Sequence, residues 1–375
     1  MSSALFSPIK LRGLTLPNRI VVSPMCQYSA IDGSANDWHL IHWGQMAMSG
    51  AGLFLIEATA TAREGRITQG CLGLYSDENE AAFKRALDAV RGQLPPSHIG
   101  VQIGHAGRKA SSRRPWEGGS LIPLGEPESW QPVGPSALVH IPGEAPAREL
   151  TRDEILRMID EFVTVAQRCE RLGLDAIELH GAHGYLIHEF LSPIANQRSD
   201  DFGGSLENRM RFPLAVYDAV RKVWPAGKPL GMRVSTTDWV EGGWDVEECI
   251  VFARELAKRG CDWIDCSSGG VAPALQKIAV GPGYQVPNAE KIKQAVPGMP
   301  VMAVGLITDP HQAEEIVASG KSDMVALARA MLYNPRWPWH AAAELGASVT
   351  GPKQYWRSTP REHPKVLGDV KVGQR

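Results

Sequence analysis

Residues 151–180 read TRDEILRMIDEFVTVAQRCERLGLDAIELH, and this stretch decides the fold class. Thr151 followed by Glu154 forms a capping box, the usual start of a helix. The apolar residues that follow recur at helical spacing on one face: Ile155, Met158, Ile159, Phe162, Ala166 and Cys169. Gly173 suits the left-handed position that ends a helix, and Ala176–His180 is a short apolar run. A helix leading into a continuously apolar strand predicts one unit of a parallel α/β sheet.

The same alternation extends along the chain. Asp245 with Glu248 repeats the helix start, and Gly260 repeats the stop. Seven further apolar runs predict strands at Ile20–Val22, Leu53–Ala58, Ile99–Gly104, Leu230–Val234, Trp263–Ser267, Val301–Val304 and Met324–Ala328. Eight strands with helices between them predict a (β/α)₈ TIM barrel. We expect one domain over residues 1–375, because such barrels often exceed the usual domain length.

Three segments go beyond a minimal barrel. Residues 9–16 predict a hairpin that turns at Gly13 and plugs the barrel bottom. Residues 105–150 are rich in Gly, Pro and Ser and lack periodicity, which predicts a long lid-like insertion after the third strand. Residues 346–375 form a C-terminal tail.

Composition narrows the class of protein. Hydrophobic residues make up 43% and charged residues 21%, and the net charge of −2 gives no attraction to nucleic acid or anionic membranes. No apolar run approaches the roughly 18 residues that span a bilayer. The first residues, MSSALFSPIKLRG, lack the features of a secretory signal, and the six cysteines lack paired spacing. We therefore expect a cytoplasmic protein with reduced thiols.

Functional residues of such barrels gather at the carboxyl ends of the strands. Gly305 follows the seventh predicted strand, and Ala328 and Arg329 follow the eighth. Backbone N–H groups at a helix start, together with an arginine, predict a phosphate site there. The alternative is that Gly305 only makes a turn and Arg329 is only a surface cation.

Arg233 and Gln102 lie on predicted strands in the middle of the barrel. A buried arginine needs an anionic or polar partner. An aromatic heterocycle with carbonyl oxygens and ring nitrogens is one such partner, since Gln both donates and accepts hydrogen bonds. The alternative is an internal ion pair of Arg233 with Glu57 or Glu178.

His180 and His183 stand three residues apart directly after a predicted strand. Two imidazoles can donate N–H bonds to one oxygen and so polarise a carbonyl group. Tyr185 brings a phenol to the same place, where it can deliver a proton. A metal site that includes Glu189 is the competing interpretation, although the chain lacks an HExxH motif.

Cys26 follows a Pro-Met turn after the first strand. It is either a packing residue or a nucleophile, and a nucleophile needs a base such as His39 or His42. The chain has no GxGxxG motif, so a nicotinamide would not bind through a Rossmann unit.

Three runs together resemble the old yellow enzymes, which are FMN-dependent barrel oxidoreductases that reduce activated alkenes. They are SPMCQY (residues 23–28), HGAHGYLIHEFLSP (180–193) and NQRSDDFGGSLENR (196–209). Cys26 after Pro-Met, with Tyr28 nearby, resembles the bacterial thermophilic-like subgroup that includes the xenobiotic reductases. The resemblance extends from about residue 4 to residue 345.

The resemblance implies a role for each matching residue. The implied flavin contacts are Ser23, Pro24, Met25, Cys26, Ala58, Gln102 and Arg233, with Gly305, Ala328 and Arg329 at the FMN phosphate. Cys26 would then modulate the flavin potential. His180 and His183 would bind the carbonyl or nitro oxygen of the substrate, Tyr185 would protonate it and Tyr28 would contact it. Residues 354–357, QYWR, resemble a tail that reaches a neighbouring subunit, which gives Trp356 a substrate contact and Arg357 a role in trans.

The function that the resemblance implies is a ping-pong ene-reductase with bound FMN and NADPH or NADH as co-substrate. Its substrates would be enones, enals, maleimides and nitroalkenes, and it would form a homodimer or homotetramer. We expect no metal, nucleic acid or membrane as a partner. Two alternatives remain: a metal-dependent barrel hydrolase or lyase that uses His180 and His183, and a non-catalytic flavin-binding barrel.

Overall fold

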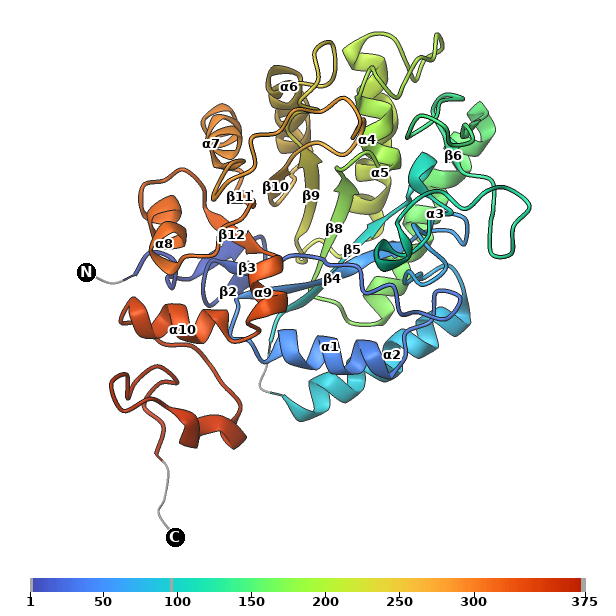
Figure 1. Cartoon of the computed structure of the whole chain (residues 1–375). Helices are drawn as coiled ribbons and strands as arrows, with labels where there is room; N and C mark the ends of the chain where they lie inside the picture. The colour runs from blue at the N-terminus through green and yellow to red at the C-terminus, as the bar shows by residue number, and fades with distance from the viewer. Residues whose placement is uncertain (1–2, 95–96, 372–375) are drawn as a thin grey trace.

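Eight parallel strands close into a barrel in the order in which they occur along the chain (Figure 1). They are β3 (Ile20–Val22), β4 (Leu53–Ala60), β5 (Ile99–Gly104), β8 (Ala176–Gly181), β9 (Leu230–Ser235), β10 (Ile264–Ser267), β11 (Val301–Ala303) and β12 (Met324–Leu327). The predicted (β/α)₈ fold is confirmed. The computed structural model describes residues 3–94 and 97–371, so residues 1–2, 95–96 and 372–375 of the predicted domain and tail lie outside the described part.

Helices surround this barrel and connect its strands (Figure 1). They are α1 (Asp37–Ala47), α2 (Asp77–Gln93), α3 (Arg152–Arg171), α4 (Leu186–Leu191), α5 (Leu206–Val223), α6 (Val246–Lys258), α7 (Val286–Ala295), α8 (Pro310–Ala318), α9 (Arg329–Tyr333) and α10 (Trp337–Glu344). None of the described helices is both long enough and apolar enough to cross a membrane.

Helix α3 begins and ends as its sequence predicts. The Thr151 hydroxyl accepts a hydrogen bond from the Glu154 backbone N–H, the Glu154 carboxylate accepts one from the Thr151 N–H, and Gly173 has a φ of 69°. At α6 the prediction is only half met. Asp245 caps the helix, but the Glu248 side chain pairs with Arg209 instead of closing a capping box.

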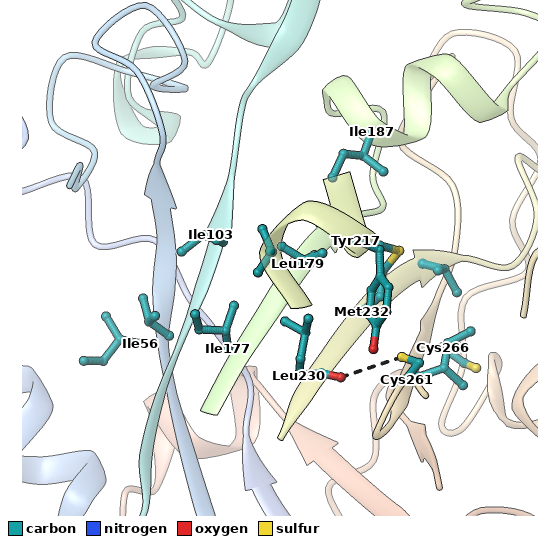
Figure 2. Close-up of a cluster of buried hydrophobic side chains, with 14 of the residues drawn as sticks. Ile56, Ile103, Ile177, Leu179, Ile187, Tyr217, Leu230, Met232, Cys261 and Cys266 are labelled. Atoms are coloured by element: carbon teal, nitrogen blue, oxygen red, sulfur yellow. Dashed lines mark hydrogen bonds between the residues drawn. The ribbon is translucent and has the colours of Figure 1, made fainter. Parts of the chain in front are cut away.

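Apolar side chains fill both the barrel interior and the layer between barrel and helices. Figure 2 shows part of this core, in which Ile56, Ile103 and Ile177 are buried beside one another on successive strands. Burial on both faces is the reason that these strands read as continuous apolar runs rather than alternating ones. All six cysteines are free thiols.

The predicted hairpin consists of β1 (Ile9–Leu11) and β2 (Leu14–Leu16), which pair antiparallel. Leu11 and Leu16 are buried against barrel residues such as Trp263, which directly precedes β10. The hairpin therefore closes the amino end of the barrel. Gly13 is required by a close approach, since a Cβ there would stand 2.4 Å from the Gly227 carbonyl oxygen.

The segment 105–150 contains more structure than its sequence predicts. It holds two short 3₁₀ helices, η1 (Gly107–Lys109) and η2 (Pro115–Glu117), and two short strands, β6 (Val133–Gly134) and β7 (Arg148–Glu149). Hydrogen bonds fasten it to the carboxyl end of the barrel: Arg108 donates to the Val271 carbonyl oxygen, and Arg198 donates to that of Pro135. The insertion therefore lies beside the strand ends where the candidate residues gather.

Candidate active site

The barrel register places three of the predicted residues on neighbouring strands. Gln102 of β5 pairs with Glu178 of β8, and His180 of β8 pairs with Arg233 of β9. Arg233 in turn stands opposite Asp265 of β10. Parallel strands end at one edge, so these side chains share the carboxyl end of the barrel.

Arg233 has an acidic partner, although not one of the two predicted. Its Nε lies 3.3 Å from Oδ2 of Asp265. Glu178 instead accepts hydrogen bonds from Gln102 and Trp263, and Glu57 accepts one from the Gln27 backbone N–H. The alternative of an internal ion pair is therefore met, with Asp265 as the partner of Arg233 in place of Glu57 or Glu178.

The Arg233–Asp265 contact leaves hydrogen-bonding capacity unused. Within the described residues, neither Nε of Arg233 nor either carboxylate oxygen of Asp265 makes a hydrogen bond. Burial raises the pKa of Asp265. A buried guanidinium that is incompletely paired fits the electron-rich edge of a heterocycle such as a flavin.

Donors for an anion gather where β12 and β3 adjoin. Gly305 has a φ of 130°, a conformation that other residues rarely adopt, and no described side chain caps the start of α9 at Ala328. Arg329 is exposed and makes no ion pair within the described residues. The buried hydroxyl of Ser23, at the end of β3, also lacks a hydrogen-bond partner there. Amides, a guanidinium and a hydroxyl fit the phosphate and ring of FMN.

Cys26 lies beside another thiol rather than beside a histidine. A hydrogen bond with Cys71 and burial raise the pKa of Cys26, so its thiol remains protonated. No signal in the sequence pairs these two residues, because they come from different loops.

The histidines proposed as bases for Cys26 have other partners. His39 accepts a hydrogen bond from the Asn36 backbone N–H, and its Nε2 lies 3.6 Å from Oε1 of Glu57. His42 packs against Phe54. The structure thus gives a nucleophilic Cys26 neither a thiolate nor the predicted base.

His180 and His183 form a perpendicular pair, with ring centroids 5.2 Å apart. Burial, and to a lesser degree the charge of Arg233, lower the pKa of both well below 6.5, so both rings are neutral. Nδ1 of His180 accepts a hydrogen bond from the Ala182 backbone N–H, which leaves the ring proton on Nε2. Nε2 of His183 lies 2.6 Å from the Ser267 hydroxyl. His180 can thus offer its Nε2–H to an oxygen, and His183 can offer its Nδ1–H to the same oxygen when the Ser267 hydroxyl donates to its Nε2.

The loop that carries His183 has a left-handed backbone. His183 has a φ of 60° and Gly184 a φ of 71°. Hydrogen bonds hold this conformation: the His183 N–H donates to the Ser235 hydroxyl at 2.9 Å, and Lys109 Nζ donates to the His183 carbonyl oxygen at 2.7 Å. A non-glycine residue in this region is costly and persists only where its surroundings fix it.

Tyr185 completes the cluster. Its ring centroid lies 4.8 Å from that of His180, and burial raises its pKa well above 10, so the phenol keeps its proton. Tyr28 and Tyr185 both line a cavity of about 180 Å³, together with Lys109 and His140 of the insertion. Tyr28 also packs edge-on against Trp116 of η2.

A metal site at the histidine pair lacks its ligands. The described residues contain no group of three or more His, Cys, Asp or Glu side chains placed to hold a metal ion. Glu189, the suggested third ligand, accepts a hydrogen bond from the Arg108 backbone N–H instead. Its carboxylate packs against Gly107.

Trp356 lies apart from every other candidate residue. It belongs to η3 (Lys353–Ser358), packs in a cluster with Val349 and Val366, and lines a groove with Pro17 and Gly52, which precede β3 and β4. This is the amino end of the barrel, opposite the histidine pair. The substrate contact implied for Trp356 would therefore have to cross a subunit boundary, and this contact and the role of Arg357 in trans stay predictions.

Comparison with known proteins agrees with this geometry. The sequence model of the NADH:flavin oxidoreductase / NADH oxidase family matches residues 4–347. An NADPH dehydrogenase of Geobacillus sp. (strain WCH70) is 43% identical over 95% of this chain and 99% of its own length. The structure of morphinone reductase superposes with a TM-score of 0.76 and 29% identity, over 94% of this chain and 92% of that one.

A second structure, a 2-naphthoyl-CoA reductase, superposes with a TM-score of 0.81 and 28% identity over 92% of this chain, which spans 52% of that longer protein. The predicted resemblance to the old yellow enzymes and the predicted cofactor and co-substrate are thereby confirmed. The chain belongs to the NADH:flavin oxidoreductase / NADH oxidase family, as an FMN-dependent oxidoreductase with NADPH or NADH as its co-substrate.

Proposed function

We propose that this enzyme reduces the C=C bond of alkenes activated by an aldehyde, ketone, imide or nitro group. The observation that carries the proposal is the cluster of two neutral imidazoles and one protonated phenol at the barrel mouth. Such a cluster can bind an electron-withdrawing oxygen and supply a proton beside it. The solved neighbours named as reductases are consistent with this chemistry.

The bound FMN supplies the hydride chemistry between the nicotinamide and the substrate. Its ring would be held by Gln102, Arg233 and the turn from Ser23 to Cys26, with Ala58 beside it, and its phosphate by Gly305, Ala328 and Arg329. Pro24 and Met25 belong to that same turn. Arg233 would supply positive charge to the bound ring and so favour its reduced, anionic form.

His180 and His183 then act on the substrate. Their N–H groups donate to its carbonyl or nitro oxygen and stabilise the negative charge that forms there when the β-carbon receives hydride. Tyr185 holds its proton for the α-carbon, and Tyr28, which lines the same cavity, would contact the substrate. Because both imidazoles are neutral, they stabilise this charge as donors and leave the proton transfer to Tyr185.

The test is a reaction of the NADPH-reduced holoenzyme with 2-cyclohexenone under anaerobic conditions. We expect the flavin absorbance to return and one equivalent of cyclohexanone to form, as measured by gas chromatography with mass spectrometry. An enzyme that is reduced by NADPH but never reoxidised by any activated alkene would contradict the proposal. A flavin that NADPH cannot reduce at all would instead favour a non-catalytic barrel.

We also propose that the enzyme is a cytoplasmic homodimer or homotetramer. In support, Trp38 and Ile41 of α1 are 50% and 52% exposed, and Tyr333 of α9 is 94% exposed. Arg336 donates to the Gln45 carbonyl oxygen, which brings these two segments side by side. Exposed aromatic surface of this kind is typical of a protein interface, and sedimentation velocity of the holoenzyme tests it.

The phosphate assignment predicts that Arg329→Ala weakens FMN binding. Loss of a charge-assisted contact costs about 1.5–3 kcal/mol, or about 10- to 150-fold in Kd. Fluorescence titration of the apoprotein with FMN measures this, and Arg85→Ala on the outer helix α2 controls for the loss of one surface cation. Equal FMN affinity in the two variants would remove Arg329 from the phosphate site.

Cys26→Ala is expected to leave an active enzyme with an altered midpoint potential of its FMN. The protonated Cys26 thiol can donate to the ring but is a poor nucleophile. Spectroelectrochemical titration measures the potential, and Cys26→Ser, which retains a donor, is the comparison. Complete inactivity with FMN still bound would instead identify Cys26 as a nucleophile.

A further inference from the structure

Lys109 is a charged residue beside the proposed proton donor that the mechanism above does not use. It ends η1 in the insertion after β5, and its side chain crosses to the loop after β8. Nζ donates to the His183 carbonyl oxygen at 2.7 Å and lies 4.5 Å from the centroid of the Tyr185 ring. The ammonium is thus anchored on one residue of the cluster and faces the aromatic ring of another.

The surroundings set the charge of Lys109. Burial lowers its pKa to about 8, with Glu189 of α4 opposing the shift and Arg108 adding to it. His140, His180 and His183 also face this ammonium, and their lowered pKa values keep them neutral. Lys109 is therefore a cation below about pH 8 and loses its charge above that value.

A cation over the face of a tyrosine ring has a specific consequence for that phenol. The attraction between an ammonium and an aromatic ring is stronger when both are removed from water. It grows further as the phenol gives up its proton, because an opposite charge nearby favours the charged form. The same contact restrains the ring, since the anchor at the His183 carbonyl oxygen fixes the ammonium.

We propose that Lys109 is a positioning residue that holds the Tyr185 ring for proton delivery and stabilises the negative charge that forms on it. The inference rests on the proposed alkene reduction. In that step the hydride supplies both electrons of the new C–H bond at the β-carbon, the π bond of the alkene breaks, and its electron pair forms the C–H bond at the α-carbon. The Tyr185 O–H bond breaks as its proton passes to the α-carbon. Solvent returns a proton to the phenolate, and Lys109 keeps its own protons throughout.

A double-mutant cycle with Tyr185→Phe tests the coupling. In the wild-type background, Lys109→Met is expected to slow the reaction of reduced enzyme with 2-cyclohexenone by about 10- to 30-fold. Lys109→Arg, which keeps the charge, is expected to stay within about threefold of wild type. In the Tyr185→Phe background, Lys109→Met is expected to slow the same reaction by less than about threefold, because residue 185 then has no hydroxyl proton to deliver.

A second measurement follows the NMR resonance of Tyr185 with pH and requires no alkene. The chain has seven tyrosines, so the holoenzyme labelled with ¹³C at Cζ of tyrosine gives few resonances, and Tyr185→Phe identifies the one of Tyr185. We expect that resonance to shift with a midpoint near pH 8 in the wild type as Lys109 loses its charge. The shift is expected to be absent in Lys109→Met and in Lys109→Arg, which do not titrate there. It is expected to remain in Glu189→Gln, which removes the neighbouring carboxyl group whose pKa burial raises to about 8.

Two results would overturn the inference. One is an equal slowing by Lys109→Met in both backgrounds, which would show that Lys109 only supports the loop. The other is a Tyr185 resonance that does not respond near pH 8. A wild-type enzyme that shows this response but does not react with any activated alkene would overturn the proposed function, and with it the role of Lys109 in proton delivery.

Discussion

Replacement of both His180 and His183 by alanine is expected to slow the reaction of reduced enzyme with 2-cyclohexenone by about 10²–10³-fold. Each imidazole is buried and neutral and has one N–H to offer. Their perpendicular arrangement, 5.2 Å between centroids, allows two donors to converge on one oxygen. Without them, the negative charge that forms on that oxygen has no preorganised donor, and water replaces them poorly in a closed site.

A phenolic ligand reports on the same two donors without turnover. We expect p-hydroxybenzaldehyde to bind the oxidised wild-type enzyme and to give a long-wavelength charge-transfer band, because its phenolate oxygen occupies the place of the substrate oxygen. The double variant is expected to lose this band while it retains FMN. His311→Ala, on the exposed face of α8, is the control for histidine loss. An undiminished band in the double variant would mean that the oxygen binds elsewhere.

The barrel and its strand ends could be predicted because burial on both faces leaves a strong pattern. Each strand reads as an apolar run, so β4 (Leu53–Ala60) was misjudged only at its end, two residues beyond the predicted Ala58. The polar residues that follow these runs then identify the carboxyl edge, where His180, Arg233 and Arg329 lie. The order of strands along the chain is also their order in the barrel, so each strand pairs with the next one and the strand order follows from the sequence.

The contacts that the sequence did not reveal depend on the register between neighbouring strands and on segments that have no periodicity. Asp265 is the partner of Arg233 because β9 and β10 pair with these two residues opposite each other, and no local pattern encodes that register. Lys109 reaches Tyr185 from an insertion that has no periodicity to read. Trp356 was assigned by resemblance alone, and its position depends on tertiary packing of the tail.

Tyr185→Phe is expected to separate the two half-reactions of the enzyme. Reaction with NADPH needs no proton from this phenol, so its rate should stay near that of wild type. Reduction of 2-cyclohexenone needs a proton at the α-carbon, and loss of a positioned general acid costs about 10²–10⁴-fold. Burial raises the pKa of Tyr185 well above 10, so the phenol is protonated near neutral pH, which suits a donor and not a base. Stopped-flow absorbance of the flavin measures both rates.

Two comparisons make this result specific to proton delivery. Tyr217→Phe removes a fully buried phenol on α5, outside the barrel, so both half-reactions of this variant should match those of wild type. In Tyr185→Phe, the rate of flavin reoxidation by a nitroalkene should fall less than the rate with cyclohexenone. The reason is that the nitronate formed is stable enough to leave before it is protonated. If Tyr185 only packs beneath the loop, both half-reactions should weaken together or neither should. Equal effects on the two rates would therefore remove Tyr185 from the role of proton donor.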